Sequence, residues 1–335
     1  MKKPIVFLLV IALLLPALAL AGQAAEEPAL YTGQVKLDLR ILAEADLAAV
    51  SLGTVPKNRI VEILDVDPFW LKIRYNGISG FIRRTSMIDT SVKTVNPAIT
   101  PPYSTVECEW LAWVKGEAPI LKAPDANAEA LITMYDGARL ALIDITDGWG
   151  RLIYHRQYAY VNTNLLSEIQ PVNKAAHPGD DAPLAAYTSF YRITTDDSNK
   201  NRMVNLQVAC DRFELYTLAN GDILDFNEHI GPYSPRVGYL PANALVKGEV
   251  VQSYGGGTCQ VSSTLYNVIL QLPGFEIVRR RAHGPSAAPY LPHGADAAVG
   301  NKVQNFIIRS NFDFPVRIDG TAQDGALTIA VYRAD

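Results

Sequence analysis

The stretch VQSYGGGTCQVSSTLYNVILQL, residues 251–272, decides how the C-terminal part of the chain folds. Three glycines end a predicted strand, because glycine accepts backbone conformations that are closed to other residues. A helix is predicted to begin near Thr258 or Cys259 and to stop at Pro273-Gly274. Its apolar face carries Val261, Leu265, Val268, Ile269 and Leu272. A cysteine in the first turn lies at the positive end of the helix dipole, which favours a thiolate nucleophile.

A thiolate nucleophile needs a base and a group that orients the base. His283 follows at the end of a predicted strand, and Asp296 follows in the segment PHGADAAV. Helix-start cysteine, then histidine, then aspartate is the chain order of papain-like and transglutaminase-like thiol enzymes. We therefore expect Cys259 as nucleophile, His283 as general base and Asp296 as the orienting group. Gln260 and the helix-start N–H groups would stabilise an oxyanion, and His293 is a competing base of lower rank.

Other interpretations of the same residues stay open. The glycines also fit a simple tight turn, the cysteine a small core residue, and the histidines solvated loop positions. Cys259, His283, His293 and Asp296 are also acceptable zinc ligands, although no CxxC or HxxxH pair supports a metal site. We expect no metal and no cofactor.

The N-terminus has the pattern of a secretory signal peptide, residues 1–21. Lys2 and Lys3 precede an apolar run, and Ala19-Leu20-Ala21 provides a small-x-small cleavage site; an uncleaved anchor is the alternative. The chain has three cysteines and a net charge of −4, which disfavours nucleic acid as a partner. A Cys108–Cys210 disulfide is possible but doubtful. We expect a secreted protein of the cell envelope, without membrane contact after cleavage.

Two β-rich segments precede the C-terminal part. Residues 30–92 alternate apolar and polar positions, and Asn76-Gly77 predicts a two-residue hairpin turn. The run WLKIRYNGISGFI resembles bacterial SH3 domains, which are small β-barrels. Residues 107–168 form a weaker second copy. The segments 93–106, which is proline-rich, and 169–183 are predicted linkers.

The C-terminal region, residues 184–335, mixes helix and strand. Residues 198–218 and 260–272 are predicted helices. Four strands are predicted at 275–281, 302–310, 314–319 and 326–333, and we expect the last three to form a meander. The fold class is therefore multidomain, with two small all-β SH3-like barrels followed by an α+β domain.

The C-terminal region resembles the VanW family in the runs GGGTCQVSSTLYN, HGPSAAPYLPHGADAAV and NFIIRSNFDFPVRI. The matching site residues are Gly255, Gly256, Gly257, Cys259, Gln260, Ser262, Thr264, Tyr266, Asn267, His283, Tyr290, Pro292, Gly294 and Asp296. Upstream, Asn227, Gly231 and Gly238-Tyr239 match as well. Thr258, Val268 and Asn220-Gly221 depart from the family pattern. The resemblance implies a cell-envelope setting but no established reaction.

Three functional hypotheses follow. In the first, SH3-like modules bind peptidoglycan or another wall polymer, and the VanW-like domain performs Cys-dependent acyl transfer as an amidase, peptidase or transpeptidase. Trp70, Tyr75 and Trp149 are the candidate contacts of the modules, with Trp70 favoured as a core residue. In the second, the protein only binds envelope ligands. The ligand site would then comprise Gly255, Gly256, Gly257, Ser262, Thr264, Tyr266, Asn267, Tyr290 and Asn227. In the third, Cys259 pairs with a partner protein during envelope assembly.

Overall fold

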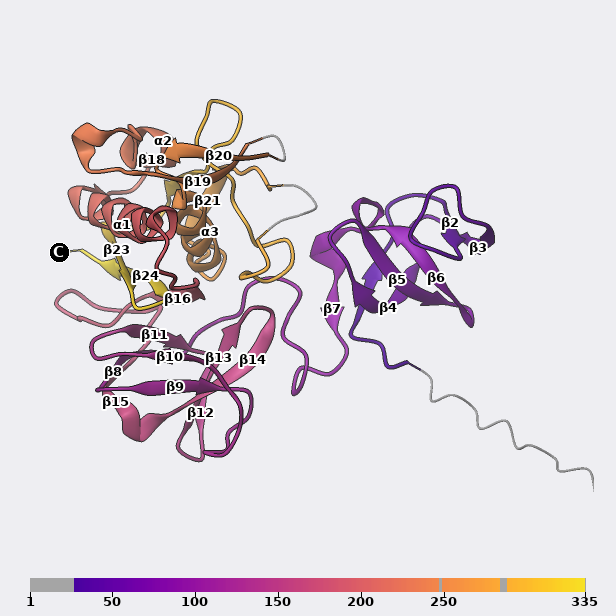
Figure 1. The fold of residues 1–335 in the computed structure, drawn as a ribbon, viewed down its shortest axis with the longest axis horizontal. Helices are drawn as coiled ribbons and strands as arrows, with labels where there is room; N and C mark the ends of the chain where they lie inside the picture. Colours follow the sequence, from indigo (N-terminus) through magenta and orange to yellow (C-terminus); the bar gives the residue numbers. More distant parts are fainter. Residues whose placement is uncertain (1–26, 247–248, 284–287, 335) are drawn as a thin grey trace, which may run out of the picture.

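The computed structural model describes residues 27–246, 249–283 and 288–334, which form three units along the chain (Figure 1). The predicted signal peptide, residues 1–21, lies outside the described residues. None of the described helices combines the length and the apolar character that a membrane crossing requires.

The first unit is one antiparallel sheet with the strand order β3-β2-β6-β5-β4-β1-β7. Its strands are β1 (Tyr31–Gln34), β2 (Leu39–Leu42), β3 (Ser51–Val55), β4 (Ile60–Val66), β5 (Trp70–Tyr75), β6 (Ile78–Arg83) and β7 (Lys93–Thr94). Asn76 and Gly77 both have positive φ and connect β5 to β6, so the predicted hairpin is confirmed. The likeness to an SH3 barrel stays a prediction.

The second unit repeats this pairing order. Its strands are β8 (Trp110–Val114), β9 (Ala118–Leu121), β10 (Ala130–Met134), β11 (Arg139–Leu142), β12 (Asp144–Thr146), β13 (Trp149–Tyr154), β14 (Gln157–Asn162) and β15 (Leu166–Pro171). They pair as β10-β9-β14-β13-β12 and β11-β8-β15. The place that β4 holds in the first unit is shared here by β11 and β12, which Ile143 separates. The repeat that the sequence indicates is therefore present in the strand pairing.

The C-terminal unit contains the three α-helices of the described chain. Its helices are α1 (Asp197–Asp211), α2 (Phe226–His229) and α3 (Thr258–Ile269). Its strands are β16 (Ala185–Phe190), β17 (Thr217–Leu218), β18 (Ile223–Asp225), β19 (Pro241–Val246), β20 (Glu249–Tyr254), β21 (Phe275–Arg279), β22 (Ile307–Ser310), β23 (Val316–Gln323) and β24 (Ala326–Arg333). They form the sheets β16-β24-β23-β17 and β18-β22-β21 and the hairpin β19-β20.

Two details of the C-terminal unit differ from the sequence prediction. The last three strands do not form a meander, because β22 pairs with β18 and β21 while β23 pairs only with β24 and β17. The first predicted helix ends at Asp211 instead of continuing to residue 218. Asp196 caps its start by accepting a hydrogen bond from the N–H of Asn199.

Both faces of the four-stranded sheet are covered. Helices α1 and α3 contact each other and pack on β23, β24 and β16, while β11 of the second unit contacts β16 and β24 (Figure 1). Strand β24 is consequently buried from Ala326 to Tyr332, with none of the alternation that a half-exposed strand shows. The second and C-terminal units share one hydrophobic cluster, whereas the first unit has a cluster of its own.

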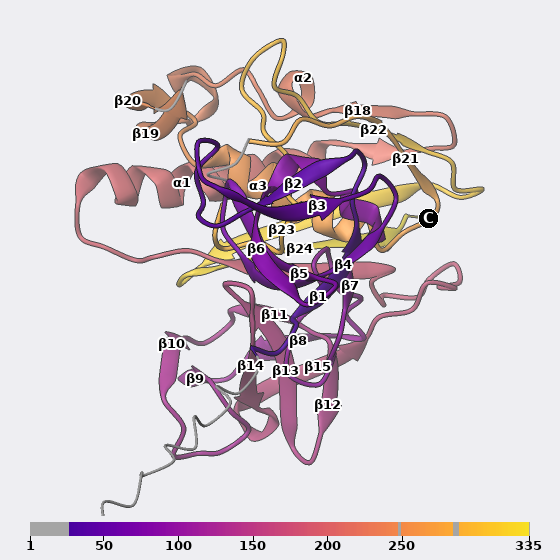
Figure 2. The same cartoon turned by 90° about the vertical axis from the view of Figure 1, so that its right-hand side faces the viewer.

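The loop of residues 288–296 contacts all three units. His293 stacks on Tyr103 of the first linker at 5.1 Å between ring centroids, and Tyr103 packs against Tyr31 of the first unit. From the second unit, Arg156 donates hydrogen bonds to the carbonyls of Leu291 and Ala288. Figure 2 shows the first unit in front of the C-terminal unit, on the side of these contacts.

We predict that protonation of His293 destabilises the folded protein. Burial, together with Arg156 and Arg84, lowers the pKa of His293 to about 3. The unfolded chain takes up this proton as the pH falls below about 6.5, so stability is lost progressively between pH 6.5 and 3. At pH 4.5 the loss should reach about 2 kcal/mol relative to pH 7. Urea unfolding at both pH values should show a smaller acid loss in His293→Phe, with the exposed His177→Phe as control; equal losses in all three proteins would contradict it.

Candidate functional site

The glycine run brings the backbone close under the β19–β20 hairpin. A Cβ on Gly256 would lie 2.5 Å from the carbonyl oxygen of Ala242 in β19, which is closer than real contacts allow. Gly257 is the N-cap of α3 with φ at 107°, and a Cβ there would lie 2.7 Å from Cγ of Arg202. Only glycine fits both positions. Helix α3 then begins at Thr258, as the sequence predicts.

Cys259 lies in the first turn of α3 and is partly exposed. Its thiol donates to the carbonyl of Val299 at 3.4 Å, and the N–H of Val299 lies 3.5 Å from the sulfur. Its backbone N–H has no acceptor among the residues that the structure describes, as is usual in the first turn of a helix. The thiol and an unpaired N–H group therefore lie side by side.

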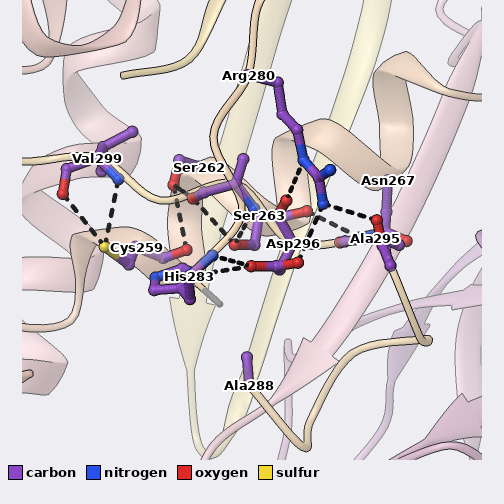
Figure 3. A network of polar contacts seen from close by, with 12 residues as sticks. Cys259, Ser262, Ser263, Asn267, Arg280, His283, Ala288, Ala295, Asp296 and Val299 are labelled. Atoms are coloured by element: carbon purple, nitrogen blue, oxygen red, sulfur yellow. Dashed lines mark hydrogen bonds and ion pairs between the residues drawn. The ribbon is translucent and has the colours of Figure 1, made fainter. Parts of the chain in front are cut away.

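His283 lies between Cys259 and Asp296 (Figure 3). Its Nδ1 is 2.8 Å from Oδ2 of Asp296, and its backbone N–H donates to the same oxygen at 2.7 Å. The side chain of His283 lies next to that of Cys259, and the interaction between them raises the pKa of His283. The three residues that the sequence singled out are thus brought into one line, in the order cysteine, histidine, aspartate.

Asp296 is buried and paired with a cation as well as with His283. Arg280 donates to its Oδ1 at 3.0 Å and, through Nε, to its backbone carbonyl at 2.6 Å (Figure 3). The guanidinium of Arg280 also lies over the ring of Tyr266, 5.0 Å from its centroid. These contacts fix the carboxylate, and the carboxylate fixes the imidazole.

The electrostatics of the pair follow from these contacts. Burial alone would lower the pKa of His283, but hydrogen bonds to Asp296 and Cys259 outweigh it and raise the pKa to about 10. Burial alone would raise the pKa of Asp296, but the two hydrogen bonds from His283 and the charge of Arg280 hold it below its usual value. At neutral pH the pair is therefore an imidazolium and a carboxylate.

Cys259 and His283 face a cavity of about 600 Å³. The predicted site residues that line it are Gly255, Gly256, Gly257, Cys259, Gln260, His283 and Tyr290. The hairpin β19–β20 contributes Asn243, Ala244, Ser253 and Tyr254, and the segment after Val299 contributes Gly300, Asn301 and Gln304. The site is therefore accessible to a ligand of the size of a short peptide.

Gln260 does not have the predicted role of oxyanion donor. Its Nε2 donates to the hydroxyl of Ser189 at 2.9 Å and to the carbonyl of Phe190 at 3.2 Å, so both amide hydrogens are used. Its Oε1 accepts from Arg202. The residue is buried and ties α3 to β16. The N–H of Cys259 beside the sulfur has no such partner among the described residues.

The predicted ligand rim on α3 is wrong. It consists of Ser262, Thr264, Tyr266 and Asn267. Ser262 is buried and donates to the carbonyl of Ala297 at 2.6 Å. The Asn267 amide, also buried, donates to the carbonyl of Ala295 at 2.8 Å. They bind the segment around Asp296 to the helix, and the cavity lies elsewhere.

Thr264 and Tyr266 are internal contacts too. Thr264 donates to the carbonyl of Gln260 at 2.7 Å and contacts the hydroxyl of Ser189. The ring of Tyr266 meets that of Phe306 edge to face at 5.5 Å. Neither residue lines the cavity that Cys259 faces.

Asn227 does not line the cavity but contacts residues that do. Its amide donates to the carbonyls of Asn301 and Gln304, and its oxygen accepts from the N–H of Gly300 and the hydroxyl of Tyr233. It therefore shapes the cavity wall without lining the cavity.

The fold places His293 outside the site. The described residues also offer no cluster that would support the zinc interpretation. His293 packs on Tyr103, away from the cavity that Cys259 lines. Among the described residues, no group of three or more His, Cys, Asp or Glu side chains is placed to hold a metal ion. All three cysteines are free thiols, and Cys108 and Cys210 are buried.

Two site residues were missed by the sequence analysis. Arg280, which pairs with Asp296, stands in the RRR run that was read only as the end of a strand. Arg202 lines the cavity from α1. The position of Arg280, three residues before His283, was a weak indication that it belongs to the site. Arg202 could not be predicted from the sequence, because it reaches the cavity only through the packing of α1 against α3.

The comparison with protein families covers this same region. Residues 201–332 match the family model described as VanW like protein. This segment is similar to the VanW family and is therefore called the VanW-like domain. A curated relative, "Uncharacterized protein YoaR" of Bacillus subtilis (strain 168), is 31% identical over 183 residues, which are 53% of this chain. The match spans 60% of that relative's length.

Solved structures with a similarity to the chain include three proteins at very low identity. "Structure of NlpC2 from Trichomonas vaginalis" has a TM-score of 0.17 at 12% identity and covers 58% of each chain. "Structure of NlpC1 from Trichomonas vaginalis" has a TM-score of 0.18 at 12% identity, covering 93% of this chain and 90% of the other. An NlpC/P60 family protein from Bacillus cereus ATCC 10987 has a TM-score of 0.22 at 11% identity, covering 89% and 93%.

We predict that Thr264→Val destabilises the VanW-like domain without affecting the cavity. The substitution keeps the shape but removes a buried hydroxyl that bonds to Gln260 and Ser189, which should cost about 1–2 kcal/mol in the free energy of unfolding. The alkylation rate of Cys259 per folded molecule should stay within about twofold of wild type. Urea unfolding and a timed alkylation assay measure the two quantities. A large fall in the alkylation rate of Cys259 with an unchanged free energy of unfolding would contradict this prediction and support a place for Thr264 on the cavity rim.

Proposed function

We propose that this protein is an exported cell-envelope protein whose VanW-like domain transfers acyl groups of wall peptides through Cys259. The observation that carries the proposal is the alignment of Cys259, His283 and Asp296 beside an open cavity of about 600 Å³. A nucleophile, a base and an orienting group within hydrogen-bond reach of one another are what covalent acyl transfer requires.

In the proposed reaction, the thiol of Cys259 first passes its proton to His283, and the sulfur then attacks the carbonyl carbon of a peptide bond as a thiolate. The oxyanion of the tetrahedral intermediate accepts a hydrogen bond from the N–H of Cys259. The carbon–nitrogen bond then breaks, and His283 gives its proton to the departing amine, leaving a thioester. Water attacks the thioester to complete hydrolysis, or a second amine attacks to complete transpeptidation, and His283 accepts the proton of the attacking group.

Asp296 keeps the imidazole in the required orientation throughout this cycle. Its Oδ2 accepts from the Nδ1 side of the ring, so the other ring nitrogen is directed at the sulfur. The pKa of His283, about 10, means that the ring is already protonated before the attack. The group that must donate a proton to the amine is therefore ready in the resting protein.

The two β units are proposed to bind the wall as SH3-like modules. The second unit has a cavity of about 420 Å³ beside Trp149, Tyr160 and Arg151. Aromatic rings with a neighbouring cation provide a stacking face and hydrogen-bond donors for a wall glycan or peptide. Trp70 of the first unit is instead buried and lies under Arg83, in agreement with the core role favoured for it.

We predict that Cys259 is alkylated rapidly at pH 6 and that His283→Ala slows this reaction at least tenfold. An imidazolium beside the sulfur stabilises a thiolate, whereas an ordinary thiol is almost fully protonated at pH 6. Because His283 keeps its proton up to about pH 10, the wild-type rate should change little between pH 6 and 9. Iodoacetamide labelling read for each cysteine by mass spectrometry gives the rates.

Matched controls make this result specific. Burial raises the pKa of Cys108 to about 12, so it serves as an unreactive internal reference. His177→Ala removes an exposed histidine far along the chain and should leave the rate unchanged. Peptidoglycan fragments are then the substrates to test, with Cys259→Ala as the inactive variant. A slow Cys259 with an ordinary pH profile would refute catalysis and favour the binding hypothesis.

We predict that Trp149→Ala reduces binding of the protein to purified cell-wall sacculi severalfold. The substitution removes the largest apolar face of the cavity in the second unit, and one stacking side chain contributes about 1 kcal/mol or more. Co-sedimentation at increasing amounts of sacculi measures the change. Tyr135→Ala, which removes an exposed aromatic residue of the same unit outside the cavity, is the control. Equal binding by both variants would exclude this cavity as the wall site.

A further inference from the structure

The side chain of Arg202 lies at the wall of the cavity that Cys259 faces. It projects from α1, and its stem lies against the backbone of Gly257, two residues before the nucleophile. One guanidinium nitrogen donates to Oε1 of Gln260, which directly follows Cys259. The remaining N–H groups of the guanidinium are not held by Gln260. Arg202 thus has a fixed position and spare donors at the site of the proposed reaction.

Arg202 has no carboxylate partner among the described residues. Arg280, Arg309 and Arg317 of the same unit all form ion pairs with aspartate or glutamate. Within the described part of the chain, no acidic side chain pairs with Arg202, whose guanidinium lies 5.8 Å from the centroid of the Tyr191 ring. Burial lowers the pKa of Arg202, because the charged guanidinium loses contact with water. A carboxylate that entered the cavity would replace part of this lost solvation.

No aspartate or glutamate lines the rest of the cavity among the described residues. The charge of His283 is balanced by its pairing with Asp296, so Arg202 is the cation of the lining without a carboxylate partner in the described part of the chain. At the start of α3, the N–H groups of Thr258 and Gln260 are bonded to the glycine carbonyls, and the N–H of Cys259 has no acceptor among the described residues. The chain as a whole carries a net charge of −4, so the lack of acidic residues in the described cavity lining is a local feature.

We propose that Arg202 binds a carboxylate of the acyl donor, so that the substrate of the Cys259 site is a peptide whose reacting amide lies next to a free carboxylate. A planar guanidinium forms paired hydrogen bonds to such a group. The carboxylate then anchors the peptide while the thiol attacks the neighbouring carbonyl. This inference rests on the proposed acyl transfer, because it names the substrate of that reaction. The preference of the cavity for an anion can nevertheless be measured without any turnover.

The first test compares two alkylating reagents that differ mainly in charge. Iodoacetate carries a carboxylate and iodoacetamide an amide, and both react with the same sulfur. The ratio of their rates at Cys259, divided by the same ratio in the urea-unfolded protein, reports the preference of the cavity for an anion. We expect this normalised ratio to lie above one in the wild type and to fall on the order of tenfold in Arg202→Met.

Two matched variants separate the charge of Arg202 from other effects. Arg202→Lys keeps the charge but not the paired geometry, and it should retain part of the preference. Lys200→Met removes an exposed cation from the same helix and should leave the ratio unchanged. His283→Ala also removes a positive charge from the site, and it is distinguished from Arg202→Met because it slows the reaction with the neutral reagent iodoacetamide as well. An unchanged ratio in Arg202→Met would overturn the proposal.

The second test uses Cys259→Ala, so it does not depend on a reactive thiol. N-acetylalanine and its methylamide are titrated into this variant by isothermal calorimetry. We expect the carboxylate to bind about tenfold more tightly than the amide, and the additional change Arg202→Met to remove that difference. Equal binding of the two compounds, or binding of neither, would overturn the proposal. If Cys259→Ala prefers the carboxylate while Cys259 of the wild type is unreactive toward alkylation, the acyl transfer is refuted and the anion site at Arg202 remains.

Discussion

The arrangement of the site depends on the burial of one carboxylate. The side chain of Asp296 is only 6% exposed, and an unpaired charge at such a position is strongly destabilising. The fold compensates by directing the guanidinium of Arg280 at one oxygen and two N–H groups of His283 at the other. The same bonds that make the buried charge tolerable also hold the imidazole in place. Stabilisation of the loop and orientation of the proposed base are therefore one interaction, and loss of either partner would affect both.

Polar residues of α3 help to hold the segment that carries Asp296 in place. The helix is buried on nearly all sides, so its hydroxyl and amide groups need partners inside the protein. Ser262, Ser263 and Asn267 find them in the backbone of residues 295–297, on both sides of Asp296. These hydrogen bonds join the helix that carries the thiol to the loop that carries the carboxylate, and they involve residues that do not line the cavity. Their separation is thereby fixed without any contact across the cavity itself.

The sequence predicted the chemistry of the site better than its surroundings. The start of α3 and the line of Cys259, His283 and Asp296 followed from glycine content, helix signals and chain order, all of which are local. The direction of Thr264 and Asn267 did not follow, because a helix buried on every side leaves no polar face to recognise. The partner of β22 was equally hidden, since short strands and turns do not specify which sheet a strand joins. Arg202 depends on the packing of α1 beside α3, a tertiary contact that no single segment encodes.

The close packing of β11 against β16 and β24 has a consequence for how this architecture can be divided. The family match begins at residue 201, after β16 has already completed one edge of the central sheet. A fragment cut at that boundary would leave β24 with an unpaired edge and an uncovered apolar face, which is the usual origin of aggregation. It would also lose the Arg156 contacts that hold residues 288–291. The unit that packs as one body in this protein is thus larger than the segment that the family model matches.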